Sequence, residues 1–191
     1  LSERLSDLDR VFSEFSREAL EFEPIVQSAF SAPREARCPF TPVSEASEER
    51  GNLVTLNWLI PYEGDLEREV GLSLLSQLLY GSQAAVLLRR LVESGLGEKP
   101  AGFGLFDIDG RGIFSAGLKG VRLEDTQAIE DLILSTLQET ADHGFAPEEI
   151  EAVINYFEFS LREEIANSAS RGISLLHYIT GPWIYRGNPF Y

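Results

Sequence analysis

Histidine and cysteine, the side chains that most often hold zinc, are scarce in this chain. Of its 191 residues, two are histidines and one is a cysteine. His143 and His177 do not have the spacing of the helical zinc motifs, in which two histidines on one helix face accompany a glutamate. Cys38 has no partner for an internal disulfide or a structural zinc site. We therefore predict no metal ligand, with His143 at the end of a helix and His177 partly buried.

Neither the serines nor the acidic clusters predict a catalytic centre. Ser82 and Ser94 lack the strand–turn–helix context of a nucleophile elbow, and no histidine–aspartate pair can be assigned to them. Two clusters of glutamates are most simply interpreted as solvated helix faces: Glu148, Glu149 and Glu151, and then Glu158, Glu163 and Glu164. No catalytic residue is predicted.

The glycine-rich run 102–112 fits neither a phosphate loop nor a calcium loop. Its "GFGLFD" part lacks a third glycine and leads into a hairpin instead of a helix N-terminus. Its "DIDGRG" part places Arg111 at a ligand position, and no glutamate follows at the calcium-loop distance. We predict no cofactor-binding residue here, and interpret the glycines as positions of close backbone approach within a strand.

The elements that would have to position any site follow from the apolar spacing. Leucines and phenylalanines three and four residues apart predict an amphipathic helix over 1–20. The proline-, serine- and acid-rich segment 22–50 predicts a connector, with one edge strand near 37–43. The alternation in "LVTLNWLIP" predicts a strand over 53–61, with its valine, leucine, tryptophan and isoleucine on one face.

Two short helices are predicted next, over 66–80 and 84–94. Gly81-Ser82 separates them, and the sharp turn there allows both helices to lie against the same face of a sheet. Gly95 and Gly97 are expected to adopt left-handed or strained φ values that return the chain to the next strand. We therefore interpret the interruption at Gly81-Ser82 as a turn between two helices and not as the site of a catalytic serine.

A hairpin and three more helices complete the pattern. Asp109-Gly110 between two β-rich runs, 102–108 and 112–118, predicts a hairpin. Helices are predicted over 123–142, ended by Gly144, and from Pro147 onward. The second of these carries the apolar stripe Ile150, Val153, Ile154, Phe157 and Leu161. A last helix over 170–180 is expected to stop at Gly181-Pro182 and leave 183–191 as a tail.

The order β-αα-ββ-αα-α predicts an α+β domain. Its sheet is mainly antiparallel, and the helices cover one face. The expected organisation is a trailing helix and connector over 1–35, followed by the α+β domain over 36–191. Because the chain contains no methionine, even at position 1, we interpret it as a piece of a longer protein.

Composition restricts the partners. The net charge of −15, from 16 basic and 31 acidic residues, disfavours nucleic acid and allows cationic partners. No apolar run approaches the roughly 20 residues of a membrane span, and no signal-peptide pattern begins at Leu1. We predict no nucleic-acid or membrane partner, and favour a soluble intracellular protein of the cytoplasm or an organelle.

Six pieces of the sequence occur in an order that resembles a known family. They are "LNWLI" (56–60), "LLYGSQAAVLLRRLVESGLG" (78–97), "FSAGLKGV" (114–121), "YFEFSLRE" (156–163), "RGISLL" (171–176) and "WIYRGNPF" (183–190). Together they resemble the second, non-zinc domain of the N-terminal half in the presequence-peptidase branch of the insulinase/pitrilysin superfamily of inverted zinc metallopeptidases. The first helix resembles the one that trails the preceding domain.

The resemblance implies a scaffold and chamber wall. Such enzymes have two homologous halves, each of two related α+β domains, which close around an aqueous chamber. Their zinc site contains a His-x-x-Glu-His motif and belongs to the first domain, and this chain has no such motif. No catalytic, cofactor or metal residue is carried over. Zinc is expected only in the parent, a metalloendopeptidase that degrades unstructured peptides such as presequences, and this segment alone is predicted to be inactive.

Two other functions stay open at this point. The chain could be a domain of a catalytically inactive relative that serves as a structural or assembly subunit, or a free-standing peptide-binding module. The resemblance also implies that Tyr191 precedes the last helix and strand of the domain, so a truncated fold with an open sheet edge is expected. The predicted partners are the remaining domains of the parent, unstructured peptides including basic ones, and a second copy of the fragment.

Overall fold

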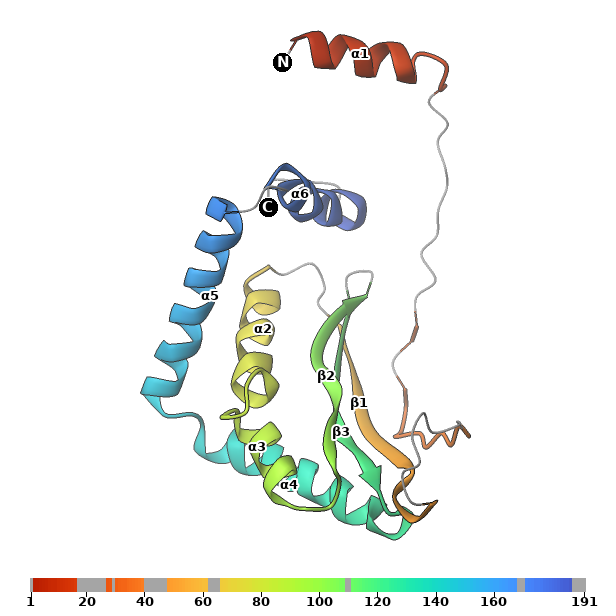
Figure 1. Cartoon of the computed structure of the whole chain (residues 1–191), viewed down its shortest axis with the longest axis vertical. Helices are drawn as coiled ribbons and strands as arrows, with labels where there is room; N and C mark the ends of the chain where they lie inside the picture. The colour runs from red at the N-terminus through yellow and green to blue at the C-terminus, as the bar shows by residue number, and fades with distance from the viewer. Residues whose placement is uncertain are drawn as a thin grey trace. The chain divides into compact units, whose positions relative to one another are not determined.

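The computed structural model describes residues 2–16, 27–28, 30–39, 48–61, 66–108, 111–167 and 171–186. It divides the chain into two compact units, 1–37 and 38–191. The described part of the second unit follows the predicted order of one strand, two helices, a two-stranded hairpin and three helices (Figure 1). The predicted α+β class is confirmed.

The first unit contains one helix, α1 (Ser2–Phe12). The prediction of a helix extending to residue 20 is wrong for 13–16, where the chain forms a turn and then irregular backbone. Ser13 donates from Oγ to the carbonyl oxygen of Arg10 at 2.7 Å, and serine bonds of this kind compete with the helical pattern. Residues 17–20 lie outside the described part.

The second unit is built on a three-stranded antiparallel sheet. Its strands are β1 (Asn52–Pro61), β2 (Lys99–Ile108) and β3 (Arg111–Val121), in the spatial order β1-β3-β2. The predicted hairpin is confirmed by the register that pairs Ile108 with Arg111, although the turn residues themselves are not described. A short 3-10 helix, η1 (Glu48–Arg50), precedes β1.

The two short helices lie on the same face of the sheet, as predicted. They are α2 (Leu66–Tyr80) and α3 (Val86–Glu93), so α3 begins two residues later than expected. No side-chain hydrogen bond caps α3 at Ala85, because alanine has no acceptor to offer. Gly95, with φ of 68°, then returns the chain to β2 in the left-handed conformation that was predicted there. The same prediction is wrong for Gly97, whose φ is not positive; a Cβ atom there would lie 2.8 Å from the Cβ of Leu118.

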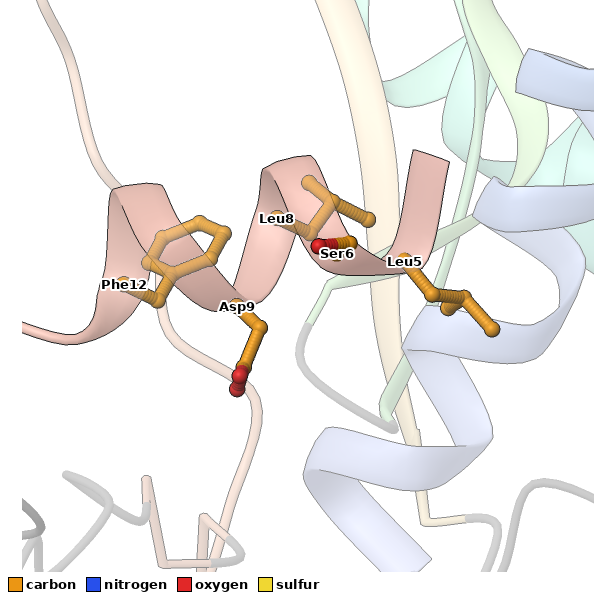
Figure 2. Close-up of a pocket in the computed structure, with 5 residues that line it drawn as sticks. All are labelled: Leu5, Ser6, Leu8, Asp9 and Phe12. Carbon is orange, nitrogen blue, oxygen red and sulfur yellow. The ribbon is translucent and has the colours of Figure 1, made fainter. Parts of the chain in front are cut away.

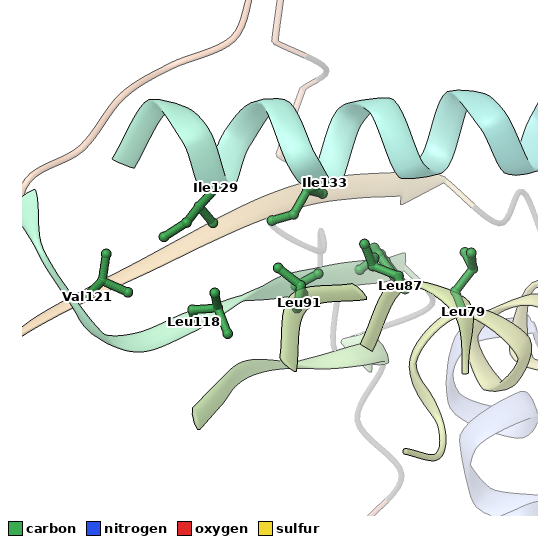
Figure 3. Close-up of a cluster of buried hydrophobic side chains, with 9 residues drawn as sticks. Leu79, Leu87, Leu91, Leu118, Val121, Ile129 and Ile133 are labelled. Atoms are coloured by element: carbon green, nitrogen blue, oxygen red, sulfur yellow. The ribbon is translucent and has the colours of Figure 1, made fainter. Parts of the chain in front are cut away.

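The hydrophobic core lies between β3 and three helices. Helix α4 (Thr126–His143) follows a 3-10 turn, η2 (Leu123–Asp125), and contributes Ile129 and Ile133, both fully buried. They point toward apolar side chains of α2, α3 and β3, as Figure 3 shows. The other members are Leu79, Leu87, Leu91, Phe114, Ala116, Leu118 and Val121. The predicted alternation in β1 is confirmed, because its apolar set packs against this core.

Helix α5 (Pro147–Asn167) begins at the predicted proline, but its apolar stripe is only partly covered. It touches α2 and α6. Val153 and Phe157 are half-buried, whereas Ile150, Ile154 and Leu161 are exposed. In the described part of the chain this helix therefore keeps an open apolar side.

Helix α6 (Arg171–Arg186) corrects a prediction, because it continues through Gly181-Pro182. Proline has a φ compatible with a helix and removes one backbone hydrogen bond, so it weakens the helix without having to end it. Residues 183–186 are thus helical and not a tail, and 187–191 lie outside the described part. The edge strand predicted near 37–43 is also wrong where it can be followed, since 37–39 are irregular and 40–43 are not described.

Candidate functional site

The two histidines lie on different helices and do not form a site. His143 ends α4 as predicted, and its Nδ1 lies 2.9 Å from the carbonyl oxygen of Glu139. His177 lies on α6 and is exposed, so the expectation that it is partly buried is wrong. A catalytic zinc ion needs three protein ligands. The described residues contain no group of three His, Cys, Asp or Glu side chains that could supply them, so we derive no zinc chemistry for this chain.

The two serines have structural surroundings. The carbonyl of Ser82 accepts a hydrogen bond from the N–H of Ala85 at 2.9 Å, within the turn between α2 and α3. Ser94 is the C-cap residue of α3, and its hydroxyl links the last turn of the helix to the chain that follows. Its Oγ donates to the carbonyl of Leu91 at 2.7 Å and accepts from the N–H of Leu96 at 3.2 Å. Neither hydroxyl has a histidine partner among the described contacts.

The acidic clusters on α5 are exposed wherever their side chains are described. Glu148, Glu149, Glu151, Glu158 and Glu163 all face solvent, while the side chain of Glu164 is not described. Glu158 accepts a hydrogen bond from Arg162 one turn later. Cys38 is an exposed free thiol. The glutamates of α5 therefore form a solvated helix face, which agrees with the prediction.

A pocket along α1 offers little chemistry. It is lined by Leu5, Ser6, Leu8, Asp9 and Phe12, all from this single helix (Figure 2). The three apolar side chains are more than half exposed. One carboxylate and one hydroxyl beside them provide neither a nucleophile–base pair nor a metal site.

Two hydrogen bonds join side chains of α2 to a bulge in β2. The sequence did not predict them. The register of β2 shifts between Ala101 and Gly104, and the glycines at 102 and 104 have φ of 100° and 67°. Ser76 Oγ accepts the N–H of Leu105 at 2.8 Å, and Tyr80 Oη donates to the carbonyl of Ala101 at 2.6 Å. The Gly-Phe-Gly spacing predicted that another segment approaches the backbone of β2 closely. It did not indicate that this segment is α2. Burial raises the pKa of Tyr80, and a backbone hydrogen bond opposes that shift.

We predict that Tyr80→Phe lowers the free energy of unfolding by about 1–2 kcal/mol, because the carbonyl of buried Ala101 loses its donor. Urea unfolding followed by circular dichroism would measure this. Tyr156→Phe is the matched control, since Tyr156 is 56% exposed on α5 and should change stability by less than about 0.5 kcal/mol. Equal effects of the two substitutions would show that the Tyr80 hydrogen bond does not stabilise the bulge.

An ion pair joins helices α3 and α4. Arg90 on α3 lies 2.6 Å from the carboxylate of Glu139 on α4. The hydrogen bond and charge of Arg90 hold the pKa of Glu139 below its usual range. Because both side chains are about half exposed, the pair serves to align α3 with α4 more than to build a reactive centre.

A further candidate surface is the face of the sheet opposite the helices, here called the outer face. Strand alternation places Leu53, Thr55, Asn57 and Leu59 of β1 on it. Phe103 and Phe106 of β2 are each more than half exposed, and their rings meet edge to face with centroids 5.7 Å apart. The residues named on this surface are apolar or uncharged, as is typical of a surface that contacts another molecule.

Comparison with known proteins gives a consistent assignment. Residues 2–157 match the family model described as the peptidase M16 inactive domain. Presequence protease 1 of Arabidopsis thaliana, from chloroplasts and mitochondria, is 36% identical over 165 residues, which is 86% of this chain and 15% of that protein. The mitochondrial presequence protease of Mus musculus is 30% identical over 183 residues, which is 95% of this chain and 17% of that protein. The chain thus spans about one sixth of the length of these curated relatives.

Two solved structures share the fold. The inactive peptidase domain of a Bordetella parapertussis protein assigned as a zinc protease aligns with a TM-score of 0.54 and 22% identity, over 72% of this chain and 71% of that one. A Bordetella pertussis protein assigned in the same way aligns with a TM-score of 0.53 and 22% identity, over 68% of this chain and 70% of that one. None of the described helices is long and apolar enough to cross a membrane.

Proposed function

The chain belongs to the M16 peptidase family, within the group of its inactive domains, and from this premise we propose that it forms a non-catalytic part of the chamber wall in a zinc metallopeptidase that degrades unstructured peptides. Zinc and its ligands would then belong to another domain of the parent protein.

The dispersion of the ligand-type side chains is the observation that carries this proposal. His143 ends α4, His177 lies exposed on α6, and no acidic cluster joins either of them among the described residues. Hydrolytic zinc sites need their ligands on adjacent turns or facing elements. This dispersion supports a domain that acts as a scaffold or binds peptides, and it offers no zinc-bound water among the described residues.

The outer face suits a wall that contacts peptides. The described helices pack on the opposite face of the sheet, so in the described part of the chain no helix covers the outer face. Its exposed aromatic pair, Phe103 and Phe106, can contact apolar side chains of a peptide whatever the charge of that peptide. Such a surface would tolerate peptides of many sequences, as presequence degradation requires.

We also propose that the excess of acidic residues helps the parent enzyme to capture basic peptides. With 31 acidic and 16 basic residues, the chain would attract basic peptides if part of the excess faced the chamber. The exposed glutamates of α5 serve solubility in this account. We propose that the connector acids Glu45, Glu48 and Glu49 are the ones free to reach the chamber mouth. Glu49 is exposed, Glu45 is not described, and the side chain of Glu48 is not described.

Stopped-flow association of a basic peptide with the parent enzyme tests this proposal. Replacing Glu45, Glu48 and Glu49 with glutamine should slow capture roughly threefold or more at low salt, because the attractive field is weakened. The difference should shrink near physiological salt, where the screening length is about 8 Å. Replacing Glu148, Glu149 and Glu151 with glutamine is the matched control, since it removes the same charge from a solvated helix face.

Two outcomes would contradict the steering proposal. Capture could be equally fast at all salt concentrations, or acidic and basic peptides of matched length could associate at the same rate. Either result would leave solubility as the role of the acidic residues, without affecting the assignment of a non-catalytic domain.

For location we propose an intracellular compartment, cytoplasmic or organellar. The presequence proteases to which the chain is similar are named for mitochondria and chloroplasts, and this supports the proposal.

A further inference from the structure

The two lysines of this chain lie directly opposite each other in the sheet, and all its other basic residues are arginines. Lys99 begins β2, and Lys119 lies near the end of β3. Residues directly opposite in an antiparallel pair point to the same face, with Cβ atoms about 5 Å apart. Because Phe114, Ala116 and Leu118 of β3 belong to the core, strand alternation places both lysines on the outer face. We call them the lysine pair.

The lysine pair has no counter-charge in the part of the chain that the structure describes. Both side chains are exposed, and neither makes an ion pair, although the chain contains 31 acidic residues. Glu98 precedes Lys99 in the sequence, but its side chain lies against Gly120, where an added Cβ would come within 2.6 Å of it. Glu124 lies 3.9 Å from Arg122 instead. Like charges directly opposite destabilise a sheet, so an anion that binds both lysines would relieve a cost present in the free chain.

The exposed rings of Phe103 and Phe106 lie on the same face, farther along β2. With a rise of about 3.3 Å per residue, they are about 10–20 Å along the strand from the lysine pair. Ala101 and Gly117, opposite each other between the two groups, have no long side chain that would separate them. An extended peptide can therefore place its end at the lysine pair and a side chain about three to six residues away on the rings.

We propose that the lysine pair binds the C-terminal carboxylate of a peptide whose apolar side chain contacts Phe103 and Phe106. This inference rests on the proposed peptide contact at the outer face, and it names the part of the peptide that is held there. Each carboxylate oxygen can accept a hydrogen bond from one ammonium group, and bonds between charged partners are stronger than neutral ones.

Charge favours the end of a peptide over an acidic side chain as the occupant. The net charge of −15 disfavours strongly acidic peptides, whereas a peptide with uncharged or basic side chains still carries one carboxylate at its end. Every linear peptide with a free end has this group, so binding it does not restrict the sequences that a chamber wall accepts.

A nuclear magnetic resonance titration of the chain with two matched peptides tests the proposal. Both peptides are short, N-acetylated and free of charged side chains, with a leucine about four residues before the end. One ends in a free carboxylate and the other in an amide. At low salt the free acid should bind roughly fivefold more tightly than the amide, and it should shift the amide signals of residues 99 and 119. The difference should shrink near physiological salt, because exposed charges are screened.

Replacing both Lys99 and Lys119 with glutamine should remove the preference for the free acid. The fold should be retained by circular dichroism, because the change relieves repulsion between like charges. Replacing Arg89 and Arg162 with glutamine is the matched control. It removes the same charge from exposed positions on α3 and α5, and it should leave the preference unaltered.

Four results would overturn the proposal, and they separate it from the proposed function. Equal binding of the two peptides, with shifts at Phe103 and Phe106, would leave a peptide contact at the outer face without a carboxylate site. Equal loss of preference in the arginine variant would reduce the effect to net charge. An amidated peptide that ends in glutamate and binds as tightly as the free acid would show that the chain end is not distinguished. Failure of both peptides to bind would also remove the proposed peptide contact at the outer face, without affecting the assignment of a non-catalytic domain.

Discussion

Replacing Gly117 with alanine should destabilise the second unit by about 3 kcal/mol, which is a large share of a typical domain's stability. Gly117 lies in the central strand β3, opposite Thr55 of β1. A Cβ atom added there would come within 2.0 Å of the carbonyl oxygen of Val54 and 2.8 Å of the Cα of Thr55. Both contacts are with backbone, so neither can be relieved by rotating a side chain. The β1–β3 ladder would have to separate locally.

Gly71→Ala provides the matched control. Gly71 lies within α2, is exposed, and has no atom within 4 Å of the position that a Cβ would occupy. The same chemical change should therefore stabilise the chain by about 0.5–1 kcal/mol, because alanine favours a helix over glycine. Urea unfolding followed by circular dichroism would measure both variants. A Gly117→Ala protein as stable as the parent would contradict the close approach of β1 to β3.

Truncation of Ile133 should have an effect of similar size. Ile133→Ala is expected to lower the free energy of unfolding by about 2–5 kcal/mol, since the side chain is fully buried and a cavity would remain between α4 and the sheet. The neighbouring residue gives the control. Leu134 is the next residue of the same helix, about 100° further around its axis, and is 45% exposed, so Leu134→Ala should cost less than about 1 kcal/mol.

This pair of variants tests the orientation of α4 directly. If the two substitutions were equally destabilising, the helix would not present Ile129 and Ile133 to the core in the way Figure 3 shows. If Leu134→Ala were the more damaging, the face assigned to the core would be wrong.

Periodicity predicted the elements that bury one clear face. β1 alternates so that Trp58 and Ile60 share a face, and α4 repeats Ile129, Ile133 and Thr136 on one side. Each pattern is local, and burial of one face is the force that selects it. These elements could be read from the sequence for that reason.

Ends of elements were harder to predict, because single residues compete there. Gly181-Pro182 was expected to stop α6, yet the helix continues to Arg186. A proline costs one hydrogen bond, and gains elsewhere in a helix can offset that cost. At α1 the error ran in the other direction, since the apolar repeat continues to Phe15 while the helix ends at Phe12.

Contacts between distant segments could not be predicted at all. Nothing in the sequence pairs Tyr80 with the carbonyl of residue 101, or places Gly117 against β1. These contacts depend on how α2 and β1 are placed on the sheet, which a pattern of neighbouring residues does not encode. Likewise, the sequence contained the exposed pair Phe103 and Phe106. The register shift between Ala101 and Gly104, which includes Phe103, accounts for the contact of two rings three residues apart, and the sequence did not predict that shift.

The central claim is that this chain is a non-catalytic domain, and its zinc content tests that claim most directly. We predict that the purified chain, after dialysis against metal-free buffer, contains far less than one zinc per molecule by mass spectrometry and does not cleave an unstructured peptide. The physical reason is that His143 and His177 lie on separate helices without a third ligand beside either of them in the described part of the chain. One zinc per chain that only a chelator removes, accompanied by peptide cleavage, would contradict the account.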